Sequence, residues 1–159
     1  MKAGVVVEEK AQRQRAAQPG IVWIKLAVVY LVIGVAMGIA MGATRDFTLR
    51  PVHAHVNLLG WTTLALSGII YTVFPQAGTT KLARAHFWLL NGALPIMMGS
   101  LAYILLTSDM QILPALVISE IAAAVSILAL TANIFLNLES RKEEESGHDT
   151  GLQPASAGY

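Results

Sequence analysis

Four apolar runs, each long enough to cross a lipid bilayer, are the feature that most limits how this chain can fold. They cover residues 21–43, 52–74, 82–106 and 111–138. A helix of about 20 apolar residues spans the roughly 30 Å hydrocarbon layer of a membrane. The segments between the runs are short and polar, so consecutive helices must run antiparallel. The sequence therefore predicts an all-α fold, a four-helix up-down bundle embedded in the lipid bilayer.

The composition supports a membrane protein and argues against a nucleic-acid partner. Hydrophobic residues make up 55% of the chain and charged residues 13%, whereas soluble domains average about 25% charged residues. The net charge of +1 gives no basic surface for nucleic acid. The two ends, residues 1–20 and 139–159, are charged or rich in Pro, Gly and Ser. We expect both to be disordered tails.

The distribution of lysine and arginine predicts the orientation in the membrane. One side carries most of these residues, namely Lys2, Lys10, Arg13, Arg15, Lys81, Arg84, Arg141 and Lys142. The other side carries Arg45 and Arg50. Both termini are therefore expected in the cytoplasm, with the chain in a bacterial-type inner membrane. His53 and His55 then lie near the outer end of the second span, and His86 lies near the inner end of the third.

The start of the second span, in "RPVHAHVNLLGW", carries two histidines separated by one residue. At 100° per residue, His53 shares a helix face with Asn57, Gly60 and Gly68, and the glycines could let a flat macrocycle approach the backbone. His55 lies about 200° away from His53, so the two imidazoles do not chelate one ion. Either ring could ligate a metal centre, or both could simply form hydrogen bonds at the membrane interface.

The first span contains glycines at four-residue intervals, at Gly34, Gly38 and Gly42. Such a ridge permits close helix packing, either within one subunit or between subunits. Met37 and Met41 flank the ridge. They either fill the core or offer thioether ligands to a cuprous ion.

Other polar residues lie inside the later spans. Glu120 must be hydrogen-bonded or paired there, and it could handle protons or contact a quinone. Interhelical hydrogen bonds are predicted for Asn91, Ser119 and Asn133. His86, beside Phe87 and Trp88, belongs either to an aromatic belt at the interface or to a cofactor or quinone site.

A resemblance to a known family rests on two stretches, "VHAHVNLLGWTTLALSGIIYTVFP" and "LARAHFWLL". They resemble helices 2 and 3 of subunit I of the haem-copper oxidase superfamily, which includes nitric oxide reductases. The resemblance implies that a histidine on the second helix is an axial ligand of a low-spin haem. The pattern "HVNLLGW" favours His55 as that ligand. The spacing to Gly68 and Pro75, together with the helical face, favours His53, which is the preferred candidate, with His55 kept beside it.

The resemblance also implies a cofactor and an assembly. The chain has no cysteine, which excludes covalent c-type attachment, so the haem would be a non-covalent haem b. The implied cofactor-binding residues are His53, His55, Asn57, Gly60, Trp61, Gly68 and His86. The family's three-histidine copper site has no counterpart here, so the chain is not expected to reduce oxygen alone. A second axial ligand would have to come from another copy, which predicts a homo-oligomer formed through a shared haem or the glycine ridge.

Three functions follow from these residues. The first is a small membrane haem protein for electron transfer or for interaction with O₂ or NO. The second is an accessory or assembly subunit of a respiratory oxidase-like complex. The third is a protein that handles copper or quinone through His53, His55, Met37 and Met41.

Overall fold

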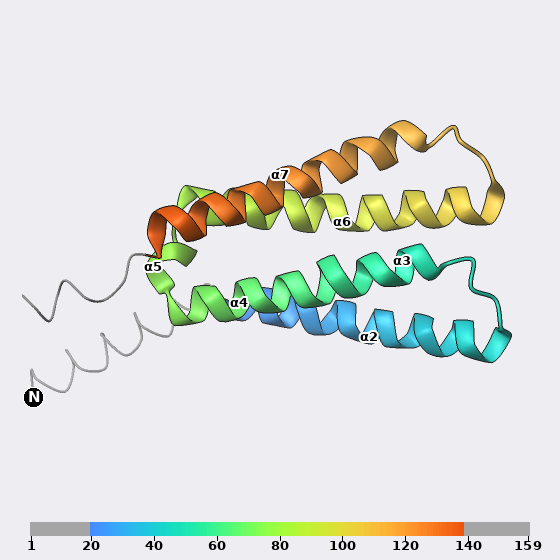
Figure 1. Cartoon of the computed structure of the whole chain (residues 1–159), viewed down its shortest axis with the longest axis horizontal. Coiled ribbons are helices and arrows are strands. Elements are labelled where there is room, and N and C mark those ends of the chain that lie inside the picture. The colour runs from blue at the N-terminus through green and yellow to red at the C-terminus, as the bar shows by residue number, and fades with distance from the viewer. Residues whose placement is uncertain (1–19, 139–159) are drawn as a thin grey trace, which may run out of the picture.

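The computed structural model describes residues 20–138, and this part of the chain is helical throughout apart from short connections (Figure 1). The predicted tails lie outside the described residues, except that Gly20 begins the first helix. The elements are α2 (Gly20–Thr44), α3 (Arg50–His55), the π-helical segment η1 (Val56–Thr63), α4 (Leu64–Val73), α5 (Pro75–Gly78), α6 (Lys81–Thr107) and α7 (Leu113–Asn137). The segments α3, η1 and α4 form one continuous span.

The prediction of an all-α fold with four long apolar helices is confirmed. Each of the four spans is long and apolar enough to cross a membrane. Large apolar side chains also cover the outside of the helices, as expected for a protein surrounded by lipid; examples are Val32, Ile39, Leu58, Trp88 and Phe135. These features identify a multi-pass membrane protein.

The helix ends follow from local sequence. Pro51 lies in the first turn of α3, where its missing N–H costs nothing. Before it, Asp46 accepts hydrogen bonds from the side chain and the backbone N–H of Thr48, and the side-chain bond in particular lowers the pKa of that carboxyl. At the start of α6, the Thr80 side chain accepts from the Ala83 N–H at 3.0 Å.

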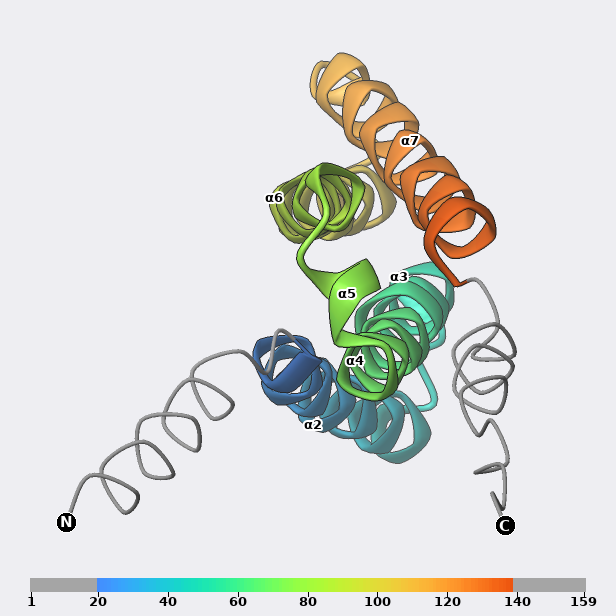
Figure 2. The ribbon, with the colours of Figure 1, turned by 90° about the vertical axis from the view of Figure 1, so that its left-hand side faces the viewer.

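The helices form two antiparallel hairpins. In the first hairpin, α2 packs along the span made of α3, η1 and α4; in the second, α6 packs along α7 (Figure 2). Contacts are denser within each hairpin than between them, and α7 meets the first hairpin chiefly through α5. We call the end with the loops 45–49 and 108–112 the loop end, and the opposite end, with α5, the α5 end (Figure 1).

The glycine ridge of α2 packs within the chain. A Cβ added at Gly34 would lie 2.6 Å from the Asn57 side-chain amide, and one added at Gly38 would lie 3.2 Å from Cε1 of His53. A Cβ at Gly42 would meet nothing within 4 Å. Gly34 and Gly38 therefore permit the close approach of α2 to the second span, whereas Gly42 does not contribute to this contact.

These glycines provide a matched pair for testing the packing. We expect Gly34→Ala to lower the free energy of unfolding by about 1–3 kcal/mol, because the new methyl group overlaps Asn57 and forces α2 and η1 apart. Gly42→Ala is expected to change stability little. Thermal unfolding of the detergent-solubilised variants, followed by circular dichroism, measures both. Equal stability of the two variants would contradict the packing of the ridge.

Candidate functional site

The two histidines of α3 make different contacts. The ring of His53 lies against Gly38 of α2. His55 instead bonds along its own helix, with its Nδ1 2.8 Å from the carbonyl oxygen of Pro51. In residues 20–138, no group of three or more His, Cys, Asp or Glu side chains is placed to hold a metal ion. The candidate chemistry at this end therefore depends on one imidazole.

The hydrogen bond of His55 determines where its proton lies. A carbonyl oxygen only accepts, so Nδ1 must carry the proton and donate it to Pro51. In the neutral ring, the lone pair is then on Nε2, which forms no hydrogen bond with any other residue of the described segment. Metal-binding imidazoles commonly have this arrangement, with one ring nitrogen donating to a carbonyl and the other free to ligate. His55 is half-buried, so this nitrogen is not enclosed in the core.

His53 has the opposite arrangement. The Asn57 side-chain nitrogen donates to the His53 carbonyl oxygen at 2.8 Å and lies 3.4 Å from Nδ1 of the His53 ring. An amide N–H facing Nδ1 favours the lone pair on Nδ1 and the proton on Nε2. Asn57 itself packs against Gly34. Both side chains are thus engaged in the contact with α2.

The glycines on the His53 face also contact α2. An added Cβ at Gly60 would overlap the Tyr30 side chain, and one at Gly68 would overlap Ile24. The sequence correctly placed His53, Asn57, Gly60 and Gly68 on one face, but a helix of the same chain covers that face. The structure does not leave a slot for a macrocycle there.

A π-helical segment begins directly after His55. The segment η1 contains Trp61, which lies half-buried against the core, and ends at Thr63, whose hydroxyl donates to the Leu58 carbonyl five residues back at 2.8 Å. Such segments are rare and often occur at functional sites, because they cost regular hydrogen bonding. Because η1 directly follows His55, this part of the span is a candidate functional site.

No known protein family, curated protein or solved structure matches the chain.

His86 lies in the second turn of α6, which starts at the α5 end, whereas His53 and His55 lie in α3, which starts at the loop end (Figure 1). It is completely buried rather than part of an interfacial belt. Its ring is tilted against Trp23, with the ring centroids 4.5 Å apart, and its Nδ1 lies 3.3 Å from the Tyr71 hydroxyl. The Ser126 hydroxyl donates to the His86 carbonyl oxygen at 3.1 Å. The three histidines of the described segment therefore form two separate sites.

Asn133 of α7 organises the polar network around His86. Its side-chain nitrogen donates to the Ala77 carbonyl oxygen at 2.9 Å and to the Tyr71 hydroxyl at 3.3 Å, and its oxygen accepts from Thr80 at 2.8 Å. Because Tyr71 accepts from Asn133, its own proton is directed to Nδ1 of His86. Nε2 of His86 then carries a proton, and it is a buried donor without a partner in the described part of the chain.

This network joins the two hairpins at the α5 end. Of the three residues predicted to form interhelical hydrogen bonds, Asn133 does so. The prediction is wrong for Asn91 and Ser119, which donate within their own helices. Asn91 donates to the Phe87 carbonyl oxygen, and Ser119 donates to the carbonyl oxygens of Ala115 and Leu116. The partners of Asn133 could not be predicted from the sequence, because nothing in the spacing of Tyr71 or Thr80 indicates which helix will face them.

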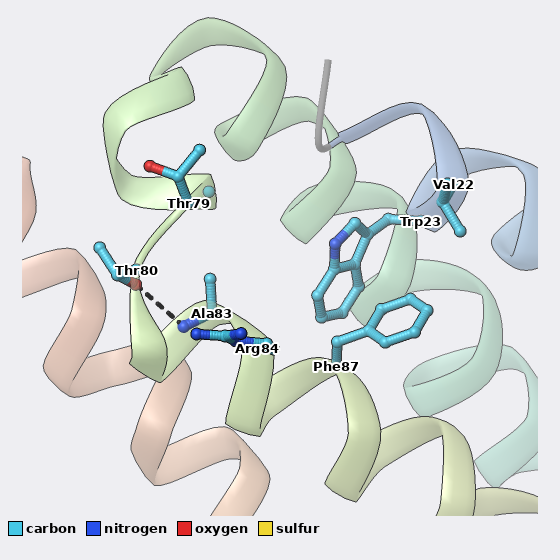
Figure 3. A pocket seen from close by; sticks show the side chains of 8 residues that line it. Val22, Trp23, Thr79, Thr80, Ala83, Arg84 and Phe87 are labelled. Atoms are coloured by element: carbon cyan, nitrogen blue, oxygen red, sulfur yellow. Dashed lines mark hydrogen bonds between the residues drawn. The ribbon is translucent and has the colours of Figure 1, made fainter. Parts of the chain in front are cut away.

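A pocket of about 510 Å³ opens beside this network (Figure 3). The rings of Trp23 and Phe87 lie together on one side of the pocket, and Thr79 and Thr80 lie on the other, with Arg84 between them. Trp23 also contacts His86, so one indole links the pocket to the buried network.

The remaining candidate residues lie apart from these sites. Met37 and Met41 line a smaller pocket of about 170 Å³ near the loop end, and neither His53 nor His55 lines it. The four proposed copper ligands therefore do not share this pocket. Glu120 lies on the exposed side of α7.

Proposed function

We propose that this chain is a small membrane protein that binds a b-type haem through His55, for electron transfer or interaction with a gas. The observation that carries the proposal is the hydrogen bond from Nδ1 of His55 to Pro51, which leaves Nε2 free. Two further features support haem binding at His55. They are the adjoining π-helical segment and the resemblance of this stretch to haem-copper oxidase subunit I. A low-spin haem held there would supply one-electron redox chemistry.

The residues of one chain fit this haem only in part. His55 offers a free ring nitrogen, while His53, Asn57, Gly60 and Gly68 are engaged with α2. The absence of cysteine requires non-covalent binding. We infer that a second axial ligand comes from another copy of the chain, since a two-fold axis brings two equivalent histidines onto opposite faces of one group.

The orientation belongs to the same proposal. The excess of lysine and arginine that the sequence predicts on the side of the two termini favours a cytoplasmic location for both, in a bacterial-type inner membrane. Most of that excess comes from residues outside 20–138. Within the described segment, Lys25, Lys81 and Arg84 lie toward the α5 end, and Arg45 and Arg50 lie at the loop end.

An absorption spectrum of the purified protein tests the proposal. Protein from haem-replete cells is expected to be red and, after reduction, to show a sharp α-band, with a pyridine haemochrome typical of haem b. Electron paramagnetic resonance of the oxidised protein would then report two histidine ligands. Colourless protein that binds no added haem would contradict the proposal.

A second candidate, quinone handling, is supported by the pocket at the α5 end. Two aromatic rings, a guanidinium group and two hydroxyl groups line it, and mostly apolar walls with a few polar groups are typical of sites for such planar molecules. Colourless protein that retains quinone through purification would favour this function over the first.

A further inference from the structure

Glu120 is a carboxyl group within the apolar part of a membrane span. It is the eighth residue of α7, which places it about 10 Å along the helix. Its side chain is exposed, as are those of its neighbours Val117 (42%) and Ile121 (59%). It forms no hydrogen bond or ion pair with any residue of the segment 20–138. In a single copy of the chain, this carboxyl would face lipid.

Such a position is costly. A charged carboxylate at the centre of a membrane helix disfavours insertion by about 2.5–3.5 kcal/mol, and polar groups in membranes almost always face protein or water. A partner that hydrogen-bonds the carboxyl would remove most of this cost.

The surroundings of Glu120 leave room for another helix. The helix α7 lies at the periphery and packs against α6 with the side next to the one that carries Glu120, through buried residues that include Ser119, Ala123 and Ser126 (Figure 2). One turn beyond Glu120 on the exposed side lies Ala124, whose small side chain permits close approach. The glycine ridge of α2, by contrast, is largely occupied within the chain.

The chemistry of the carboxyl favours a second copy as the partner. A neutral carboxylic acid donates one hydrogen bond and accepts another, so it is complementary to itself. A two-fold axis places identical residues opposite each other. The lysines and arginines of the described segment lie in loops or within the first six residues of a helix, and none lies at the depth of Glu120.

We propose that two copies of the chain associate through α7, with their Glu120 carboxyl groups hydrogen-bonded to each other across a two-fold axis. This association does not depend on haem. The association gives Glu120 a direct hydrogen-bond partner in the membrane. The exposed side of α7 then forms the interface between the two protomers.

Measurement of dimerisation in lipid bilayers tests the proposal. Copies labelled with donor or acceptor fluorophores are diluted with lipid, in the His55→Ala background so that a shared haem cannot hold them together. The dimer is expected to weaken about tenfold or more in Glu120→Leu. Glu120→Gln should keep it within about threefold, because a carboxamide also pairs with itself. Ile118→Ala, an exposed change on another side of α7, should leave it unchanged.

Cross-linking adds a test of geometry. The chain contains no cysteine, so Ala124→Cys introduces the sole thiol. Oxidation is expected to link two copies efficiently through Ala124→Cys and poorly through Ile118→Cys.

Equal dimerisation of Glu120→Leu and the parent, a parent that stays monomeric, or loss of the dimer in Glu120→Gln would each overturn the proposal. None of these outcomes bears on haem binding, which the spectrum tests separately. Both changes at Glu120 replace an ionisable side chain on the lipid-facing side with one that cannot ionise, so neither is expected to impair folding.

Discussion

Replacement of His55 by alanine is expected to remove haem from the purified protein, with occupancy at least about tenfold below the parent, because the change removes the ring nitrogen whose lone pair the Pro51 bond leaves free. His53→Ala is expected to keep most of its haem. That change instead leaves a gap against Gly38 and should lower stability by about 1–3 kcal/mol. Haem content per protein, from the pyridine haemochrome, and thermal unfolding measure the two effects separately.

Added imidazole provides a control for the first variant. If His55 acts as a ligand, imidazole should restore part of the haem spectrum in His55→Ala, since a small ligand can enter the vacated position. A haem-free His53→Ala beside a haem-replete His55→Ala would reverse the assignment. Full haem content in both variants would place the ligand elsewhere.

Replacement of Asn133 by leucine is expected to lower the free energy of unfolding by about 2–4 kcal/mol. The change removes one hydrogen bond each from the Ala77 carbonyl, the Thr80 hydroxyl and the Tyr71 hydroxyl. The local bond between Thr80 and Ala77 remains, but it does not involve α7. Because this network joins the two hairpins, the loss should appear as separation of the hairpins before each one melts. Unfolding in a denaturing detergent, followed by Trp fluorescence and by circular dichroism, measures both stages.

Asn91→Leu is the matched control for this prediction. Asn91 is also an asparagine in a membrane span, but its side chain donates within the helix to the Phe87 carbonyl. Its replacement is expected to cost less than about 1 kcal/mol, because a local bond to an already bonded carbonyl adds little. If both leucine variants were equally stable, the network would not hold the hairpins together.

The positions of the spans could be predicted from sequence because hydropathy is a local property. The first run, 21–43, corresponds to Gly20–Thr44, and the third run, 82–106, corresponds to Lys81–Thr107. The starts of two spans differ by two residues: the second begins at Arg50 rather than at residue 52, and the fourth begins at Leu113 rather than at residue 111. Pro114 accounts for the later start of the fourth helix, since proline favours the first turn of a helix.

The partners of each helix face could not be predicted in the same way. Helical periodicity placed His53 and Gly68 on one face, but only the structure shows that α2 covers it. The same limit applies to polar residues: Asn133 and Asn91 look alike in sequence, yet one crosses between hairpins and the other bonds to its own helix. The preference for His55 over His53 likewise depends on which acceptor each ring meets.

The π-helical segment η1 sets the rotation of one end of its span relative to the other. A π-helical turn holds one residue more than an α-helical turn, and each residue of a helix turns the chain by about 100°. Deletion of one residue within Val56–Thr63 would let the span become a plain α-helix. With Tyr71 fixed by the network at the α5 end, the start of the span would then swing by about 100°. His55 would then face a different neighbour. The extra residue of the π-helical segment therefore determines the direction in which His55 points relative to Tyr71.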